Sequence, residues 1–359
     1  MTKFQKIIIA VILAVVIFLF VYYFSNVFIW LIFSLFITII GYPIMKLLSK
    51  IKYKKFHIPR WLSAIFSITT IYFLIYGVIA IIVPLVNGEL KELKSTDITT
   101  ISERLEEPIN NINNFINNND LLNETTFSLE DFVIEKTTLL LDFNIITKVI
   151  NGIGSYAISF FMFLFAVTFL SFFILKDKVL LENKVLNLLP QKSLPNVIKV
   201  IKSIKNLISR YLFGLIIQII CIAICLIIGF WIVGTNFYLA ILVGLVAALL
   251  NIIPYIGPWI GAAIAILLVS ISNIHLDLYT GILPHNMKLL IVVIIVQIID
   301  NVVFQPIIYS KSIKAHPIEI FIIIIIAGSI YGIIGMMLAI PTYIIVRVIA
   351  KELLYLSYE

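Results

Sequence analysis

Residues 297–317 read QIIDNVVFQPIIYSKSIKAHP, and they begin inside a long apolar run that starts at Leu289. Asp300 stands within that run, among residues suited to face lipid. A charged side chain at the centre of a membrane-spanning helix costs at least about 2.5–3.5 kcal/mol on insertion scales, and such residues are usually functional. The stretch therefore predicts a membrane-spanning helix that carries a functional carboxylate.

Amide side chains accompany this carboxylate. Gln297, Asn301 and Gln305 are spaced four residues apart, which places them on one side of an α-helix beside Asp300. One interpretation is a path for a substrate or an ion. The other is helix packing, because Asn and Gln side chains also form hydrogen bonds between membrane helices. The packing interpretation would be stronger if Asp300 lay at the edge of the membrane, and Lys311 follows it closely. We favour the path for a substrate or an ion.

The composition is that of a multi-pass membrane protein. Of 359 residues, 62% are hydrophobic and 13% are charged, whereas a soluble domain has about 45–50% apolar and about 25% charged residues. The net charge of +7 requires no nucleic-acid partner, because the basic residues gather between apolar runs, where they set orientation. Cys221 and Cys225 lie one helical turn apart in an apolar run, so neither a disulfide nor a metal site is expected.

Apolar runs and basic loops together predict the topology. A run of about 20 apolar residues can cross the hydrocarbon core as a helix. Short basic loops are expected in the cytoplasm, which places the loop 46–60, the segment 176–210 and both chain termini on that side. The expected spans before the last hairpin are 7–24, 27–47, 61–86, 153–175, 211–233 and 288–308.

One sizeable polar region separates the third and fourth expected spans. Its acidic excess fits an extracytoplasmic position. Apolar residues recur in it at steps of three or four, which predicts a helix with an apolar stripe. This stripe needs a partner surface, either in the membrane part or in a neighbouring subunit, and we expect a homo-oligomer. The stripe consists of Ile98, Ile101, Leu105, Ile109, Ile112 and Ile116.

The chain is thus expected to have three parts. They are a three-span bundle (1–87), an acidic helical insert (88–150) and a C-terminal transport domain (151–359). The last part includes the basic segment 176–210, whose apolar residues from Val197 to Ile208 share one helix face. This amphipathic helix either lies on an anionic membrane surface or extends the fifth span into the cytoplasm.

Proline and glycine interrupt the apolar segment 237–272. The break reads NIIPYIGPWIG at 251–261, and its Pro254, Gly257 and Pro258 do not fit a regular helix. Each flanking arm is shorter than a crossing requires. We expect a helical hairpin that crosses or re-enters the membrane from outside. Backbone groups exposed around Tyr255 must then line protein or a watery cavity.

A second apolar segment, 317–348, is interrupted in a similar way. It contains Gly332, Gly335 and Pro341, and it is expected to enter from the cytoplasmic side. Two oppositely entering hairpins are typical of secondary transporters with a site near the middle of the membrane. The glycines then act as hinges of the hairpins. The alternative is that they only allow helices to pack closely.

Three motifs together resemble the autoinducer-2 exporter family, also called PerM-like permeases. They are NIIPYIGPWIG at 251–261, DNVVFQPIIYSKSIKAHPI at 300–318 and GSIYGIIGMMLAIP at 328–341. The resemblance implies a bacterial inner-membrane protein with about eight transmembrane helices. The breaks described above predict that one or two hairpins in its C-terminal half are broken or re-entrant. It also implies export of autoinducer-2, a quorum-sensing molecule, or antiport of sodium or lithium ions against protons.

Enzymatic function is not expected. HExxH and G-x-S-x-G motifs and a P-loop are absent from the sequence, and no cofactor or metal is expected. A secondary transporter or a channel remains, and a non-transporting membrane scaffold is a further alternative. Expected partners are membrane lipids and a small polar solute or a monovalent cation or proton. The predicted substrate or ion path comprises Asp300, Asn301, Gln297, Gln305, Asn251, Pro254, Tyr255, Gly257 and Pro258.

Overall fold

The computed structural model describes residues 24–50, 52–53, 56–95, 143–187, 194–273, 275–309 and 316–356. Within these ranges the chain is helical apart from turns and two short antiparallel strands, β1 (Lys52–Tyr53) and β2 (Phe56–His57). The predicted all-α fold class is confirmed. Almost all of the first expected span and the whole apolar stripe of the insert lie outside the described residues, so both stay predictions.

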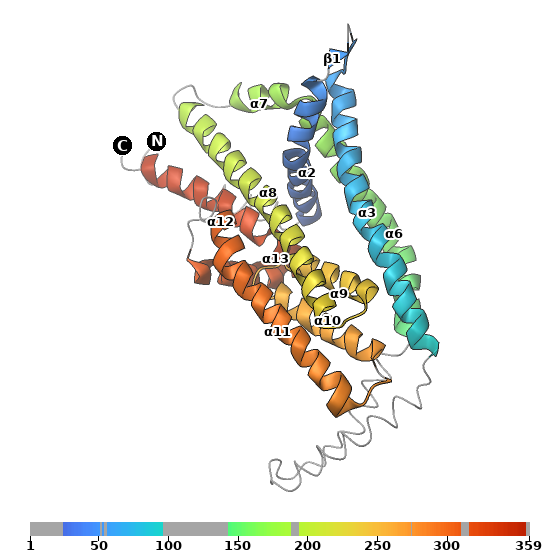
Figure 1. The fold of residues 1–359 in the computed structure, drawn as a ribbon. Helices are drawn as coiled ribbons and strands as arrows, with labels where there is room; N and C mark the ends of the chain where they lie inside the picture. Colours follow the sequence, from blue (N-terminus) through green and yellow to red (C-terminus); the bar gives the residue numbers. More distant parts are fainter. Residues whose placement is uncertain are drawn as a thin grey trace. The chain divides into compact units, whose positions relative to one another are not determined.

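The helices follow the chain in the order of the colours in Figure 1. Two of them, η1 and η2, are π-helical turns within one long run. The bounds are α2 (Ser25–Lys50), α3 (Arg60–Ser95), α6 (Phe143–Lys176), α7 (Lys178–Asn187), α8 (Leu194–Ile232), α9 (Phe237–Leu250), α10 (Gly257–Ser272), η1 (Leu278–Ile282), α11 (Leu283–Ile299), η2 (Asp300–Phe304), α12 (Gln305–Tyr309) and α13 (Pro317–Leu356).

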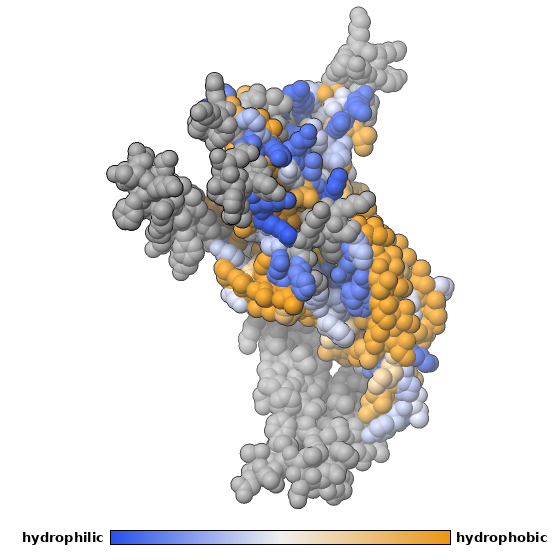
Figure 2. Space-filling model, turned by 90° about the vertical axis from the view of Figure 1, so that its left-hand side faces the viewer, coloured by the Kyte–Doolittle hydropathy of each residue, from blue (hydrophilic) through white to orange (hydrophobic). Residues whose placement is uncertain are grey.

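Long apolar helices make up most of the described chain. Six stretches have the length and composition to cross a membrane, and α9 and α10 are shorter apolar helices. Large apolar side chains on them, such as Phe73 and Phe161, are exposed, and Figure 2 shows hydrophobic surface of this kind in orange. Lipid tails are as apolar as these side chains, so the exposure suits a multi-pass membrane protein. The six stretches are Asn26–Lys50, Arg60–Glu89, Ala157–Lys176, Leu194–Ile232, Leu278–Ile307 and Ile318–Lys351.

The chain forms two compact units that do not follow chain order. Unit 1 comprises residues 1–78, 160–217 and 306–359, and unit 2 comprises 79–159 and 218–305. The helices α3, α6 and α8 each contribute residues to both units. Asp300 belongs to unit 2, whereas the interrupted segment 317–348 belongs to unit 1.

Small and hydroxyl side chains join α2, α3 and α6 in unit 1. The Ser67 hydroxyl donates a hydrogen bond to the Gly41 carbonyl oxygen at 2.6 Å. The Ser171 hydroxyl of α6 donates to the carbonyl oxygen of Ser34 at 3.2 Å. Such residues let membrane helices approach closely and bond across the contact, in the absence of a hydrophobic driving force between them.

The basic segment of unit 1 contains two helices. The short helix α7 lies across the direction of α8 in Figure 1, and α8 then runs without a break from Leu194 to Ile232. The apolar face that ends at Ile208 is therefore part of the same helix as the fifth span. The ammonium groups of Lys178 and Lys205 lie 3.9 and 5.0 Å from the centre of the Tyr42 ring, as in cation–π contacts.

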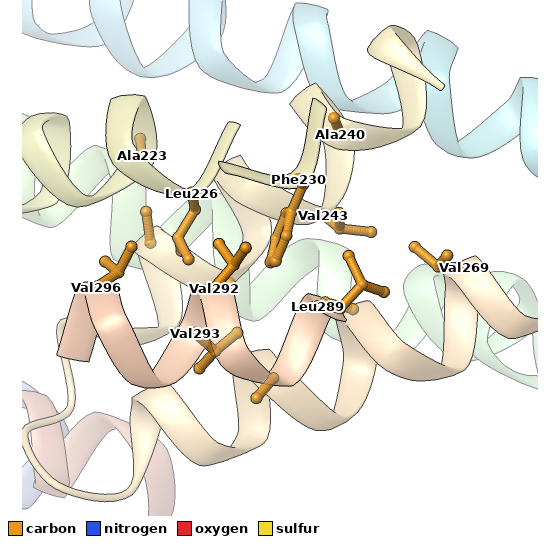
Figure 3. Close-up of a cluster of buried hydrophobic side chains, with 14 of the residues drawn as sticks. Ala223, Leu226, Phe230, Ala240, Val243, Val269, Leu289, Val292, Val293 and Val296 are labelled. Atoms are coloured by element: carbon orange, nitrogen blue, oxygen red, sulfur yellow. The ribbon is translucent and has the colours of Figure 1, made fainter. Parts of the chain in front are cut away.

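Unit 2 is built around one hydrophobic core. In Figure 3, Phe230 of α8 points toward Leu289 and Val292 of α11, with Val243 of α9 beside it. Glycines bring these helices together, because a Cβ atom at Gly229 would overlap the side chain of Val292. This core holds α8, α9, α10 and α11 against one another, and it fixes the helix that carries Asp300.

Candidate functional site

Asp300 begins a π-helical turn. The run of helix from α11 to α12 changes to a π-helix over Asp300–Phe304, and the Gln305 N–H bonds to the carbonyl oxygen of Asp300 five residues earlier. Pro306, directly after this turn, has no N–H, and its ring would clash with a carbonyl in a regular helix. The wider turn relieves this clash, and π turns occur frequently at functional sites.

Two glutamines hold the carboxyl group of Asp300. The Gln305 Nε2 atom donates to Oδ2 at 2.8 Å, and the Gln218 Nε2 atom donates to Oδ1 at 2.6 Å. Asp300 is 1% exposed and Gln218 is 3% exposed. In a regular α-helix, residues five apart point about 140° away from each other. The π turn is therefore what brings Gln305 to Asp300.

The amides predicted around Asp300 are connected. The Asn301 Oδ1 atom accepts hydrogen bonds from Gln305 Nε2 at 2.8 Å and from Gln297 Nε2 at 3.2 Å. Gln297, Asn301 and Gln305 thus form a ladder along one face, as their spacing predicts. Asn301 is exposed, so the ladder runs from the surface of the protein to the buried carboxyl group.

Asn251, in the break between α9 and α10, also lies near the Asp300 carboxyl group. It follows the last residue of α9 and is 6% exposed. Its side chain is a hydrogen-bonding neighbour of the Asp300 carboxyl group, although its buried Nδ2 atom makes no short, well-aligned contact. The structure thus brings together Asp300, Gln305 and Asn251 from the predicted path.

The other predicted residues of the break shape its backbone. Tyr255 has a φ of 67°, a conformation that side chains rarely adopt and that often occurs at functional sites. A Cβ atom at Gly257 would overlap the carbonyl oxygen of Leu250, so only glycine fits. The helix α10 begins at Gly257 with Pro258 in its first turn, where proline is favoured. Pro254 lies in the turn between the two helices.

The second interrupted segment folds back on itself within α13. Its backbone leaves the helical conformation at Tyr331 and Gly332, where φ is 58° and ψ is −141° at the glycine. A Cβ atom at Gly335 would overlap the carbonyl oxygen of Ala327, so the two arms approach closely there. Pro341 is buried within the second arm.

A polar chain joins the two arms away from the bend. The Tyr343 hydroxyl donates to Glu319 Oε2 at 2.5 Å, and Arg347 Nη1 donates to the Tyr343 hydroxyl at 2.8 Å. These side chains are at the surface of unit 1, and they connect residues 24 positions apart.

Gln218 was not among the residues predicted from the sequence. It lies on α8 inside the apolar run from Leu212 to Ile232, where it is a polar interruption. An amide in such a run usually finds a partner on a neighbouring helix. That feature could have placed Gln218 among the candidates, but the sequence does not indicate which helix holds the partner.

His275, before η1, and His285, in the first turn of α11, are not part of a metal-binding cluster among the described residues. Asp277 Oδ2 accepts hydrogen bonds from the N–H groups of Tyr279 and Thr280, at 3.0 and 2.9 Å, and so begins η1. The His285 Nε2 atom lies 3.1 Å from the Thr235 hydroxyl. Across the described residues, no group of three or more His, Cys, Asp or Glu could hold a metal ion.

The fold and the site together indicate which class of protein this is. A multi-pass helical membrane protein with a buried carboxylate among amides, beside a broken helix pair, has the architecture of membrane transporters. The chain belongs to the AI-2E transporter family, because the model of that family, described as AI-2E family transporter, matches residues 7–355. The family resemblance inferred from the motifs is confirmed.

Curated relatives agree with this assignment. The chain is 28% identical over 315 residues to the putative transport protein YueF of Bacillus subtilis, covering 85% of this chain and 78% of YueF. It is 27% identical over 210 residues to the putative transport protein YrrI of the same organism, covering 58% and 56%. It is also 27% identical over 191 residues to the putative permease PerM of Escherichia coli K12, covering 52% and 50%.

Proposed function

We propose that this protein is a secondary transporter of the bacterial cell membrane that moves a small polar solute, and that the solute or its coupling ion binds at Asp300. One observation carries the proposal: the Asp300 carboxyl group is buried at a broken helix pair and is held by the neutral amides of Gln218 and Gln305. Ionisable groups inside a membrane segment usually mark a path for substrate, ions or protons.

The broken helices support the same proposal. In secondary transporters, interrupted helices place unpaired backbone groups beside the transported species. Here Asn251 and Tyr255 belong to such an interruption, and Asn251 lies against the carboxyl group. A scaffold that only packs against other membrane proteins would need neither a buried carboxylate nor a strained turn next to it.

The finer function that we propose is export of autoinducer-2, with a role in quorum sensing. Antiport of sodium or lithium ions against protons is the alternative, since carboxylate and amide oxygens are common ligands of hard cations. Both forms of transport would use the same residue, so one experiment compares them.

The test is transport by the purified protein in liposomes. Uptake of autoinducer-2 and of sodium is measured under an imposed pH gradient, for the unchanged protein and for Asp300→Asn. The substitution keeps the shape of the side chain but removes its charge, so transport is expected to fall to the level of empty liposomes. Full activity of Asp300→Asn, with normal expression and assembly, would refute the proposed role of Asp300.

Orientation and assembly complete the proposal. We propose that the N- and C-termini lie in the cytoplasm, because short basic loops favour that side. A protease or thiol-reagent assay on intact cells checks each end. The apolar stripe from Ile98 to Ile116 needs burial, so we propose a homo-oligomer. Light scattering in mild detergent is expected to give more than one subunit, and a fully active monomer would contradict it.

A further inference from the structure

Two ammonium groups meet at one aromatic ring in unit 1. Tyr42 lies on α2, Lys178 is the first residue of α7, and Lys205 lies on α8. The two lysine nitrogens are 3.9 and 5.0 Å from the centre of the Tyr42 ring, and all three residues are half-buried. Three helices that are distant in sequence thus bring two positive charges to one place.

This arrangement suits an anion. Like charges that lie close together repel each other, and partial burial strengthens the repulsion because less water screens it. The face of the Tyr42 ring attracts an ammonium group by about 0.5–1 kcal/mol, which helps to hold both lysines here. An anion that contacts both lysines gains two attractions at once, and lysine is a common ligand of phosphate groups.

The Tyr42 hydroxyl is a third polar group beside the pair. In the part of the chain that the structure describes, this hydroxyl forms no hydrogen bond. The hydroxyl of Tyr72 on α3, by contrast, is bonded to the Thr168 hydroxyl at 2.6 Å. A tyrosine hydroxyl can donate to a phosphate oxygen. At this position it would add one hydrogen bond to the two charge contacts.

The sequence around the two lysines is strongly basic. Residues 176–210 contain eight lysine or arginine residues and two carboxylates, Asp177 and Glu182. The Asp177 carboxylate, next to Lys178 in sequence, lies 3.8 Å from the Lys176 ammonium group. The segment keeps a large excess of positive charge, and such an excess attracts anions.

Two further lysines lie on the same helix faces. Lys46 follows Tyr42 by four residues on α2, and Lys202 precedes Lys205 by three residues on α8. Residues at these spacings share one side of a helix. Both lysines are exposed. The basic patch around Tyr42 therefore consists of Lys46, Lys178, Lys202 and Lys205.

The basic patch lies where membrane-crossing stretches end. The stretch in α6 ends at Lys176, two residues before Lys178, and the stretch in α2 ends at Lys50. The short helix α7 then lies across the direction of α8 (Figure 1). Lysine and tyrosine side chains near such ends reach the level of the lipid headgroups. Basic pockets between transmembrane helices bind anionic headgroups, so the anion that fits this patch is part of a lipid.

We propose that Tyr42, Lys178 and Lys205 form a binding site for the phosphate group of an anionic phospholipid such as phosphatidylglycerol. The two ammonium groups contact the phosphate oxygens, and the Tyr42 hydroxyl donates to one of them. Lys46 and Lys202 disfavour lipids whose headgroup carries a positive charge. The bound lipid connects α2, α7 and α8. This site belongs to unit 1, whereas Asp300 belongs to unit 2, so it does not depend on the transported solute.

The first test is a lipid titration. The Tm of the purified full-length protein in detergent is measured with added phosphatidylglycerol and with phosphatidylcholine, whose choline group carries a positive charge. Phosphatidylglycerol is expected to raise the Tm by at least about 3 °C more, because it binds the folded form. Sodium phosphate without lipid is expected to give no such rise. Equal effects of the two lipids, or an equal rise with sodium phosphate, would overturn the proposal.

The second test locates the site. Lys178→Gln combined with Lys205→Gln removes both charges at Tyr42, and the half-saturating concentration of phosphatidylglycerol is expected to rise more than about tenfold. The matched control is Lys184→Gln combined with Lys199→Gln, which removes two exposed charges from the same two helices. The control is expected to bind the lipid as the unchanged protein does. An equal loss in both proteins would mean that the basic segment attracts lipid diffusely, without a site.

Two more variants guard against misfolding of the glutamine variant. Lys178→Arg combined with Lys205→Arg keeps both charges and is expected to keep the lipid effect, because arginine also binds phosphate. Tyr42→Phe keeps the ring and removes only the hydroxyl. Its Tm without lipid is expected to stay the same, while the half-saturating concentration rises several-fold, as for one lost hydrogen bond. An unchanged lipid affinity, or a lower Tm without lipid, would show that the Tyr42 hydroxyl does not bind the lipid.

Discussion

Gln218 on α8 donates a hydrogen bond of 2.6 Å to Asp300, although the two residues are 82 positions apart. The contact joins the fifth expected span to the helix that carries the carboxylate. Both residues are buried in unit 2. It is therefore α8, together with the break after α9, that completes the surroundings of Asp300.

Replacement of Gln218 by leucine tests this contact. Gln218→Leu leaves the Asp300 Oδ1 atom without this donor in a buried place, which costs about 1–3 kcal/mol. We expect a lower Tm and a fall in liposome transport of at least about tenfold. Ile217→Leu, at the exposed neighbouring position, is the control and should change neither. A Gln218→Leu variant with the Tm and rate of the unchanged protein would contradict the role of this bond.

The π turn can be tested at Pro306. Pro306→Ala supplies the missing N–H and removes the ring, so the helix can close as a regular α-helix. Gln305 would then turn away from Asp300. We expect transport to fall several-fold while the Tm stays equal or rises, a combination that simple destabilisation does not produce.

The control for this variant is another proline of the same helical run. Pro284 lies at the start of α11, directly after the π turn η1 and about four helical turns before Asp300 in sequence, so its replacement leaves the turn at Asp300 unchanged. Pro284→Ala should keep full transport. Equal activity of the Pro306→Ala and Pro284→Ala variants would show that the π turn is not needed.

Two glycines that differ in their surroundings test the turn beside Asn251. Gly257→Ala forces a Cβ atom onto the carbonyl oxygen of Leu250, and we expect a loss of stability of more than about 2 kcal/mol. A Cβ atom at Gly77 in α3 would meet nothing within 4 Å, and alanine there should gain about 0.5–1 kcal/mol. Chemical or thermal unfolding of both variants in detergent measures the difference. Equal stabilities would mean that the turn rearranges freely.

The polar chain between the two arms of α13 gives a fourth prediction. Tyr343→Phe removes the hydroxyl that connects Glu319 with Arg347. The arms are then held mainly by packing near the bend. Spin labels at Ile318 and Val346, in a protein without Cys221 and Cys225, should show a broader distance distribution. Tyr331→Phe is the control, and an unchanged distribution in Tyr343→Phe would show that packing alone holds the arms.

Local sequence patterns were sufficient to predict the long helices and the places where they are interrupted. The apolar runs predicted the long helices, because the length of an apolar run decides whether it can cross a bilayer. The glycines and prolines at 251–261 and at Gly332 predicted the interruptions, since these residues exclude regular helix through their own geometry. The motifs around the same positions were enough to assign the family. Each of these properties belongs to a short stretch of chain.

The surroundings of Asp300 depended on the tertiary structure. The spacing of Gln297, Asn301 and Gln305 indicated a polar face, but a regular helix would have turned Gln305 away from Asp300, and only the π turn brings them together. The bond from Gln218 and the position of Asn251 arise from packing of separate helices around the core of Phe230. Contacts of this kind depend on how helices distant in sequence fit together, and no local periodicity encodes that fit.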